Sequence, residues 1–208
     1  MSIHTTPRLP LVAILRGLEP ASAEAIGSAL FDAGFRILEV PLNRPGALEC
    51  ISRLSAIAPT DALVGAGTVL SVDDVEAVQA ADGKLIVSPN CNPAVIRHSV
   101  QLGLFSAPGI ATPTEALAAL DAGAHALKIF PAEQVGSAGL KALLSVLPSG
   151  TPIWPVGGIT PQSMAGWVKV GATGFGIGSQ LYAPGTSAEQ VGQRAASFVA
   201  AWKACQPS

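Results

Sequence analysis

The stretch HALKIFPA, His125–Ala132, places a lysine in the middle of an apolar run. The run has the length and composition of a buried strand, where an unpaired ammonium is costly. Of the five lysines in the sequence, Lys128 alone falls within a predicted strand. Burial lowers the pKa of a lysine, and the neutral amine can attack a ketone to form a Schiff base. Lys128 is therefore the predicted covalent catalyst.

Glu39, in ILEVPLN, is the only one of the fourteen acidic residues predicted to lie in a strand interior. Two opposite charges in one sheet can also form a buried ion pair that merely fills the core. Such a pair stabilises a fold poorly, because desolvation consumes most of the Coulombic gain. This argument favours a functional role, in which Glu39 carries protons directly or through a water.

Two polar side chains at predicted strand ends could bind an anionic substrate. Arg16 follows the first strand, LPLVAILRG, and its guanidinium suits a carboxylate. A surface arginine at a strand end fits the sequence equally well. Thr68, in GAGT, could give its hydroxyl to the same carboxylate. A threonine that stabilises a turn is the alternative.

Glycine-rich turns follow the last two predicted strands. The segments PVGGIT and GFGIGSQ present backbone N–H groups with few side chains in the way, which is typical of a phosphate site. Tight turns that simply need glycine are the alternative. Neither segment has the GxGxxG spacing of a dinucleotide fingerprint. The predicted phosphate-binding residues are Gly157, Gly158, Gly178 and Ser179.

A repeated pattern of helix, glycine and apolar strand must position these residues. It recurs in FDAGFRILEVPLN, AADGKLIVSPN, VQLGLFSAPGI, LDAGAHALKIFP and VKVGATGFGIGS. The glycines can adopt the left-handed conformation that ends helices. They are Gly34, Gly83, Gly103, Gly123 and Gly171. The apolar runs that follow predict parallel strands covered on both faces.

Three more strands, LPLVAILRG, ALVGAGTVL and PIWPVGGIT, bring the predicted number to eight, each followed by a helix. This pattern predicts one (β/α)₈ TIM barrel domain spanning residues 1–208, with a flexible N-terminal segment at 1–8. An open doubly wound sheet is the alternative. In a TIM barrel the active site lies at the C-terminal ends of the strands, where the residues above are found.

Composition narrows the possible partners. A net charge of -2 and scattered basic residues argue against nucleic acid, and no apolar run reaches the ~20 residues of a membrane helix. The three cysteines form no CxxC pair, and the N-terminus does not resemble a signal peptide, which together predict a cytoplasmic protein. The three histidines form no metal-binding motif. Charged residues make up only 12%, which favours a surface partly covered by other subunits.

The motifs LVAILRG, LEVPLN, GAGTVL, SPN, APGIATPTEA, ALKIFPAE and VGGIT, in this order, resemble the class I aldolases of 2-keto-3-deoxy-6-phospho sugar acids. The resemblance runs from about Leu9 to Tyr182. It implies a small-molecule keto acid substrate, no cofactor or metal, a cytoplasmic location and usually a homotrimer. The family roles that it assigns are the Schiff-base lysine at Lys128, proton transfer at Glu39, substrate binding at Arg16 and Thr68, and phosphate binding at Gly157, Gly158 and Ser179.

Within that family, PLN after Glu39 and Val156 before the paired glycines resemble the 6-phosphogalactonate branch, while FPAE after Lys128 also resembles the 6-phosphogluconate branch. The resemblance implies reversible cleavage of the galactonate substrate to pyruvate and glyceraldehyde 3-phosphate. The sequence leaves open the gluconate epimer, with or without 4-hydroxy-2-oxoglutarate. It also leaves open a non-covalent sugar-phosphate epimerase or isomerase, and a non-catalytic sugar-phosphate-binding protein.

Overall fold

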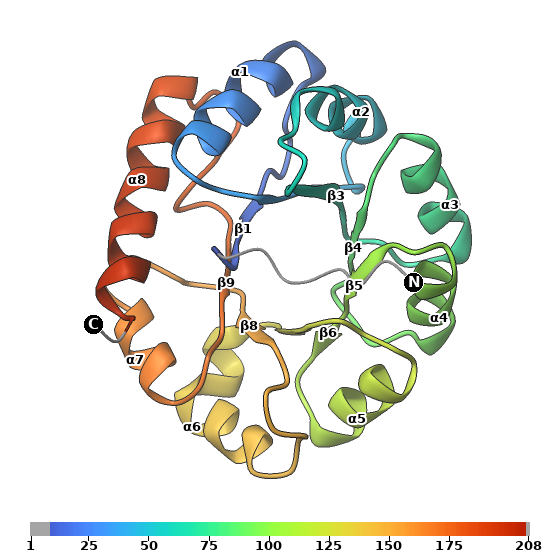
Figure 1. Cartoon of the computed structure of the whole chain (residues 1–208), viewed down its shortest axis with the longest axis vertical. Helices are drawn as coiled ribbons and strands as arrows, with labels where there is room; N and C mark the ends of the chain where they lie inside the picture. The colour runs from blue at the N-terminus through green and yellow to red at the C-terminus, as the bar shows by residue number, and fades with distance from the viewer. Residues whose placement is uncertain (1–8, 207–208) are drawn as a thin grey trace.

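The computed structural model describes residues 9–206, so the predicted N-terminal segment at 1–8 lies outside the described residues. Strands and helices alternate along the described chain, with the helices arranged around the strands (Figure 1). The strands are β1 (Leu11–Ile14), β2 (Ile37–Pro41), β3 (Leu63–Gly67), β4 (Leu85–Val87), β5 (Phe105–Ala107), β6 (Gly109–Ile110), β7 (Leu127–Ile129), β8 (Ile153–Pro155) and β9 (Phe175–Ile177). The helices are α1 (Pro20–Asp32), α2 (Ala47–Ile57), α3 (Val72–Ala80), α4 (Pro93–Gln101), α5 (Pro113–Asp121), α6 (Ala132–Leu144), α7 (Met164–Lys169) and α8 (Ala188–Ala204).

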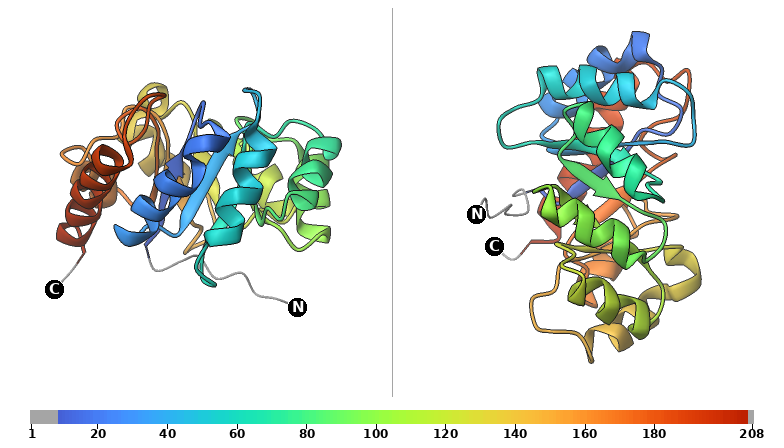
Figure 2. Two further views of the ribbon diagram at one scale, coloured as in Figure 1. Left: turned by 90° about the horizontal axis from the view of Figure 1, so that it is seen from above. Right: turned by 90° about the vertical axis from the view of Figure 1, so that its right-hand side faces the viewer.

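The strands are divided between two parallel sheets. The first has the order β5-β4-β3-β2-β1-β9, and the second has the order β6-β7-β8. The predicted fifth strand is thus two short strands interrupted at Pro108, since proline has no N–H to donate to a ladder. The Pro108 carbonyl still accepts a hydrogen bond of 2.9 Å from the Lys128 N–H. The α/β class and the alternation of strand and helix are confirmed, and the helices lie on the outer side of a curled parallel sheet (Figure 2).

The apolar core has two parts. The larger cluster includes side chains of the outer helices, such as Leu30 and Phe198, packed on the strands. The smaller cluster is built from strand side chains, among them Val12, Phe105 and Trp154. Phe105 of the first sheet stacks on Trp154 of the second, with ring centroids 5.8 Å apart. The smaller cluster therefore holds the two sheets together from inside.

Helix ends follow the predicted chemistry, with one correction. Capping boxes start α3, α5 and α8, where Ser or Thr is followed three residues later by Asp, Glu or Gln. Four of the five helix-ending glycines have positive φ, as predicted, but Gly83 does not; Asp82 adopts the left-handed conformation instead, with φ 60°. Gly83 is needed for space, because a Cβ there would lie 2.5 Å from Val78 Cγ1.

Candidate active site

Lys128 and Glu39 face one cavity from strands of the two sheets. Lys128 is the middle residue of β7 and Glu39 the middle residue of β2. Each lies two residues after a member of the inner apolar cluster, Ala126 and Ile37 respectively, so the period of two in a strand directs both side chains inward. The two residues are only 8% and 1% exposed. Both line one cavity of about 10 Å³, close to the smallest space that holds a water.

The lysine and the glutamate do not form a space-filling ion pair. No ion pair within 4.0 Å joins them in the described chain, and Glu39 Oε2 is buried without a hydrogen-bond partner there. An unsatisfied buried oxygen costs folding free energy, so a protein core built for stability alone would gain nothing from this one. The arrangement therefore favours the functional interpretation of the pair.

Burial moves both groups toward their neutral forms. It lowers the pKa of Lys128; the Glu39 carboxylate opposes this shift and the Arg16 guanidinium adds to it. Burial raises the pKa of Glu39, against the opposing effect of Lys128 and Arg16. A neutral amine is the nucleophile that imine formation requires, and a carboxyl group can serve as both proton donor and proton acceptor.

Two neighbours of this pair were not predicted as site residues. Gly67, at the end of β3, makes room for the carboxylate, because a Cβ at this position would overlap Glu39 Oε2. Phe130 follows β7 directly, and its ring centroid lies 5.1 Å from Lys128 Nζ. Phe130 is 38% exposed, and its ring face lies over the Lys128 amine. Gly67 belongs to the GAGT segment and Phe130 to the HALKIFPA run, but in each segment only the neighbouring Thr68 or Lys128 was predicted as a site residue.

Arg16 and Thr68 lie beyond the ends of β1 and β3, at the same end of the sheet. Arg16 is exposed, and its charge acts on both Lys128 and Glu39. Thr68 is half-buried and has φ 57°, an uncommon conformation for a β-branched residue and one that is concentrated at functional sites. Neither side chain donates or accepts a hydrogen bond within residues 9–206, so the Thr68 hydroxyl does not stabilise its turn.

The two glycine turns lie side by side. Gly157 and Gly158 follow β8 with φ of 121° and 62°, and Gly178 and Ser179 follow β9. A parallel bridge between Val156 and Gly176 joins the two segments. The N–H groups of Gly158, Gly178 and Ser179 donate to no other described residue. Unpartnered N–H groups at adjacent turns are what an anion needs.

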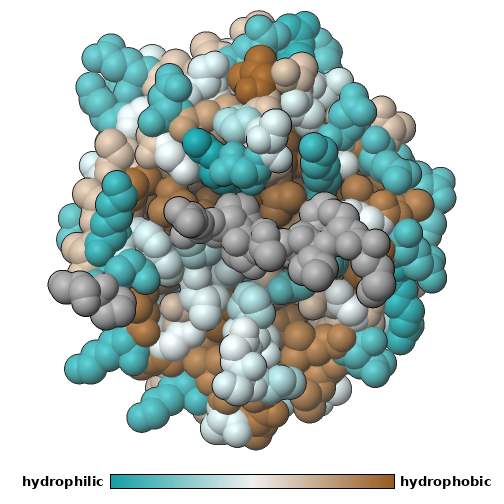
Figure 3. Space-filling view, viewed as in Figure 1, coloured by the Kyte–Doolittle hydropathy of each residue, from teal (hydrophilic) through white to brown (hydrophobic). Residues whose placement is uncertain are grey.

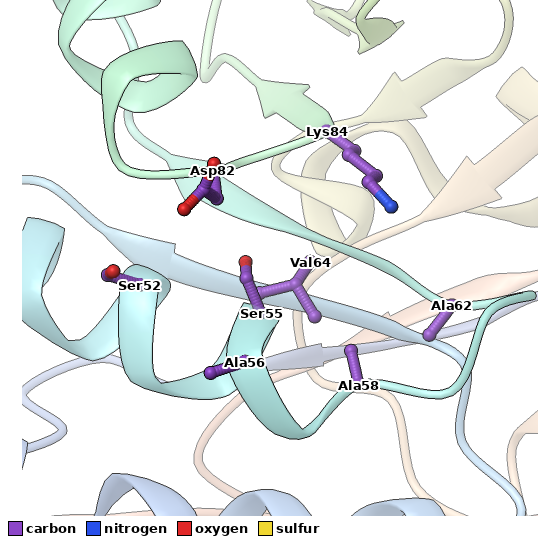
Figure 4. A pocket seen from close by; sticks show the side chains of 8 residues that line it. All are labelled: Ser52, Ser55, Ala56, Ala58, Ala62, Val64, Asp82 and Lys84. Carbon is purple, nitrogen blue, oxygen red and sulfur yellow. The ribbon is translucent and has the colours of Figure 1, made fainter.

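A larger cavity, of about 290 Å³, lies at the opposite end of the strands (Figure 4). Its wall includes Ala62 and Lys84, which come just before β3 and β4. None of the predicted site residues lines it. Within residues 9–206, no group of three His, Cys, Asp or Glu residues could hold a metal ion, and no helix is long and apolar enough to cross a membrane.

The fold and the site together define a class: an α/β protein with a buried amine and a buried carboxyl group facing one cavity, beside a polar rim. The family model described as KDPG and KHG aldolase matches residues 3–193. The chain belongs to this family.

Two curated relatives are similar over nearly their whole length. A probable 2-dehydro-3-deoxy-6-phosphogalactonate aldolase of Rhizobium meliloti (strain 1021) is 47% identical over 94% of this chain and 92% of its own. The 2-dehydro-3-deoxy-6-phosphogalactonate aldolase of Escherichia coli (strain K12) is 46% identical over 94% of this chain and 96% of its own.

Solved structures of similar proteins include members of the same aldolase family. One described as native KDPGal has a TM-score of 0.94 at 45% identity and covers 97% of this chain and 98% of its own. A protein cage designed by fusing symmetric oligomeric domains has a TM-score of 0.93 at 46% identity, over 96% of this chain and 74% of its own. KDPG aldolase from Legionella pneumophila, with pyruvate captured as a covalent carbinolamine, has a TM-score of 0.79 at 25% identity, over 96% of this chain and 95% of its own.

Proposed function

We propose that this protein is a class I aldolase that reversibly cleaves 2-dehydro-3-deoxy-6-phosphogalactonate to pyruvate and D-glyceraldehyde 3-phosphate. The observation that carries the proposal is the separated pair of Lys128 and Glu39, both buried and both facing one cavity. Two relatives of 46% and 47% identity with this named activity support the choice of substrate. Capture of pyruvate as a carbinolamine in a related aldolase supports a covalent route.

The chemistry starts at the amine. Neutral Lys128 Nζ adds to the C2 ketone, and loss of water with uptake of one proton from solvent gives a protonated imine. Glu39, through a water, takes the C4 hydroxyl proton. The C3–C4 bond then breaks, its electron pair forms an enamine with the imine carbon, and glyceraldehyde 3-phosphate leaves. The proton held by Glu39 passes to C3, and water hydrolyses the protonated imine, which releases pyruvate, the free amine and one proton to solvent.

Residues at the C-terminal ends of the strands would bind the carboxylate and the phosphate of the substrate. Arg16 and Thr68, whose side chains have no partner in the described chain, would bind the carboxylate. The N–H groups of Gly158, Gly178 and Ser179, with the adjoining Gly157, would bind the phosphate. Val156 lines the same cavity as Lys128 and offers only methyl groups. It would leave the C4 hydroxyl without a side-chain partner on that side, which is a physical basis for preference between C4 epimers.

The proposed enzyme is one closed (β/α)₈ barrel. The bridge between Val156 and Gly176 supports closure on one side, and the hydrogen bond from the Lys128 N–H to the Pro108 carbonyl supports it on the other. With β5 and β6 counted as one interrupted strand, eight strands would alternate with eight helices within residues 9–206.

The proposed assembly is a homotrimer in the cytoplasm. Apolar residues gather in the lower part of the view in Figure 3, where Figure 1 places α5 and α6. Leu117 of α5 and Val146, two residues after the end of α6, are 46% and 56% exposed. The similarity to a cage built from symmetric oligomeric domains also supports association. Burial of these side chains against another copy would account for the low share of charged residues.

A second candidate activity is cleavage of the gluconate epimer, with or without 4-hydroxy-2-oxoglutarate, which the FPAE segment and the family itself support. Comparison of kcat/KM for the two phosphorylated epimers separates these activities. We expect a higher value for the galactonate epimer and no turnover by Lys128→Met with either. Turnover by Lys128→Met would contradict the covalent route, and a higher gluconate value would reverse the choice of substrate.

A further inference from the structure

Glu133 brings a negative charge to the turn that would bind phosphate. It belongs to the first turn of α6, five residues after Lys128, and its side chain is exposed. The carboxylate lies against the paired glycines of the next strand end. A Cβ on Gly157 would overlap Glu133 Oε2, and a Cβ on Gly158 would lie 3.0 Å from Glu133 Oε1.

No cation neutralises this carboxylate. Among residues 9–206, Glu133 has neither an ion-pair partner nor a side-chain hydrogen bond. Its place in the first turn of a helix accounts for its presence, since the positive end of the helix dipole attracts an acidic side chain. The charge nevertheless lies against the turn of Gly157 and Gly158, where the Gly158 N–H group has no hydrogen-bond partner among the described residues.

We propose that Glu133 lowers the affinity for a phosphate dianion of the turn that contains Gly157 and Gly158. The proposal rests on the phosphate position assigned to this turn under the proposed function. A phosphate ester carries a charge of about −1.5 to −2 at pH 7, so a neighbouring carboxylate repels it. The consequence is a phosphate subsite that holds its ligand loosely and releases the phosphorylated aldehyde readily.

The expected size of the repulsion between Glu133 and a phosphate dianion follows from Coulomb's law. For a dianion about 6 Å from a single charge in a water-like dielectric, the repulsion corresponds to a factor of about ten in affinity. The site is open to solvent, so salt must reduce the effect, and at ~1 M ionic strength most of it is screened. A role of Glu133 in the helix alone predicts no such change in phosphate affinity.

The test compares Glu133→Gln with the control Glu76→Gln, which removes the same charge from α3. In the wild type Glu76 Oε1 lies 3.3 Å from His98 Nε2. The probe is sn-glycerol 3-phosphate, and its dissociation constant is measured by ³¹P NMR titration at low salt and at 1 M salt. We expect Glu133→Gln to bind the probe about tenfold more tightly than the wild type at low salt. The difference should shrink at high salt, and Glu76→Gln should match the wild type.

Unchanged or weaker binding by Glu133→Gln overturns the proposal, and so does a tenfold gain that Glu76→Gln shares. These outcomes do not depend on turnover. If the wild type cleaves the phosphogalactonate substrate and Glu133→Gln binds the probe no better, only the role of Glu133 fails. If the wild type cleaves neither epimer while Glu133→Gln binds the probe more tightly, the proposed reaction fails and the charge effect at the turn stands.

Discussion

The position of the Glu39 carboxylate depends on the absence of a side chain at residue 67, so Gly67→Ala is the sharpest perturbation of the proton path. The new Cβ would occupy the space of Glu39 Oε2, and the carboxylate must move by about 1 Å or more to leave it. Displacement of a catalytic group by about 1 Å can cost roughly 10²-fold in rate. We therefore expect Gly67→Ala to lower kcat by about 10²-fold while Lys128 still forms an imine with pyruvate.

The matched control is Gly166→Ala in α7, where a Cβ would contact nothing within 4 Å. The assay couples pyruvate release to lactate dehydrogenase, at a temperature below the melting point of both variants. Overpacking at residue 67 costs about 1–3 kcal/mol of stability, which thermal unfolding measures separately. Steric coupling to the carboxylate also predicts that Glu39→Asp, with its shorter side chain, restores part of the activity of Gly67→Ala in a double-mutant cycle.

Two results would contradict a steric link between residue 67 and the Glu39 carboxylate. A folded Gly67→Ala with kcat within twofold of the wild type would show that the carboxylate position seen here is not the one used in proton transfer. Loss of imine formation together with turnover would show that the substitution damages the whole cavity, so that separate roles for Lys128 and Glu39 would no longer follow.

Further predictions concern charge and the rim of the site. Because the pKa of Glu39 is raised above 4.5 by burial, the folded state holds a proton that the unfolded state loses first. The free energy of unfolding of the wild type should therefore fall relative to that of Glu39→Gln as the pH rises from 4.5 to the folded-state pKa. Urea unfolding across this pH range measures the difference, and a difference that stays constant with pH would contradict the raised pKa. Because burial lowers the pKa of Lys128, borohydride trapping with pyruvate should reach its plateau below pH 10.5, and a rise that continues past this value would count against a neutral amine. Gly158→Ala strains a turn with φ 62° and should raise KM for the phosphorylated substrate severalfold without changing the trapping of pyruvate; an unchanged KM would remove this turn from the phosphate site.

Periodicity and turn chemistry were enough to predict most of the fold. The helix-ending glycines, the Ser and Thr caps and the apolar runs give the strand and helix order that the structure shows. The interruption of the fifth strand at Pro108 was not predicted. An apolar run does not show whether the missing N–H group of a proline will divide the strand in two. Gly83 was assigned a conformation that Asp82 adopts, since either residue could take the left-handed position and only the packing on Val78 decides.

The part of the site that could be predicted from the sequence is the pair of charged residues in apolar strands. Lys128 and Glu39 stand out because charged residues in predicted strands are rare, and the structure brings both to one cavity. Gly67, Phe130 and Glu133 were missed for a different reason. A small residue, an aromatic residue after a strand and an acid at a helix start all have ordinary structural explanations. Their roles depend on which side chains from distant strands lie against them, and local sequence does not contain that information.

Mass spectrometry of the protein after incubation with pyruvate and borohydride tests directly whether Lys128 forms an imine with the keto acid. We expect one reduced pyruvyl adduct on the tryptic peptide that contains Lys128, present in the wild type and in Glu39→Gln and missing in Lys128→Met. An adduct on another lysine, or none in the wild type, would contradict imine formation at Lys128.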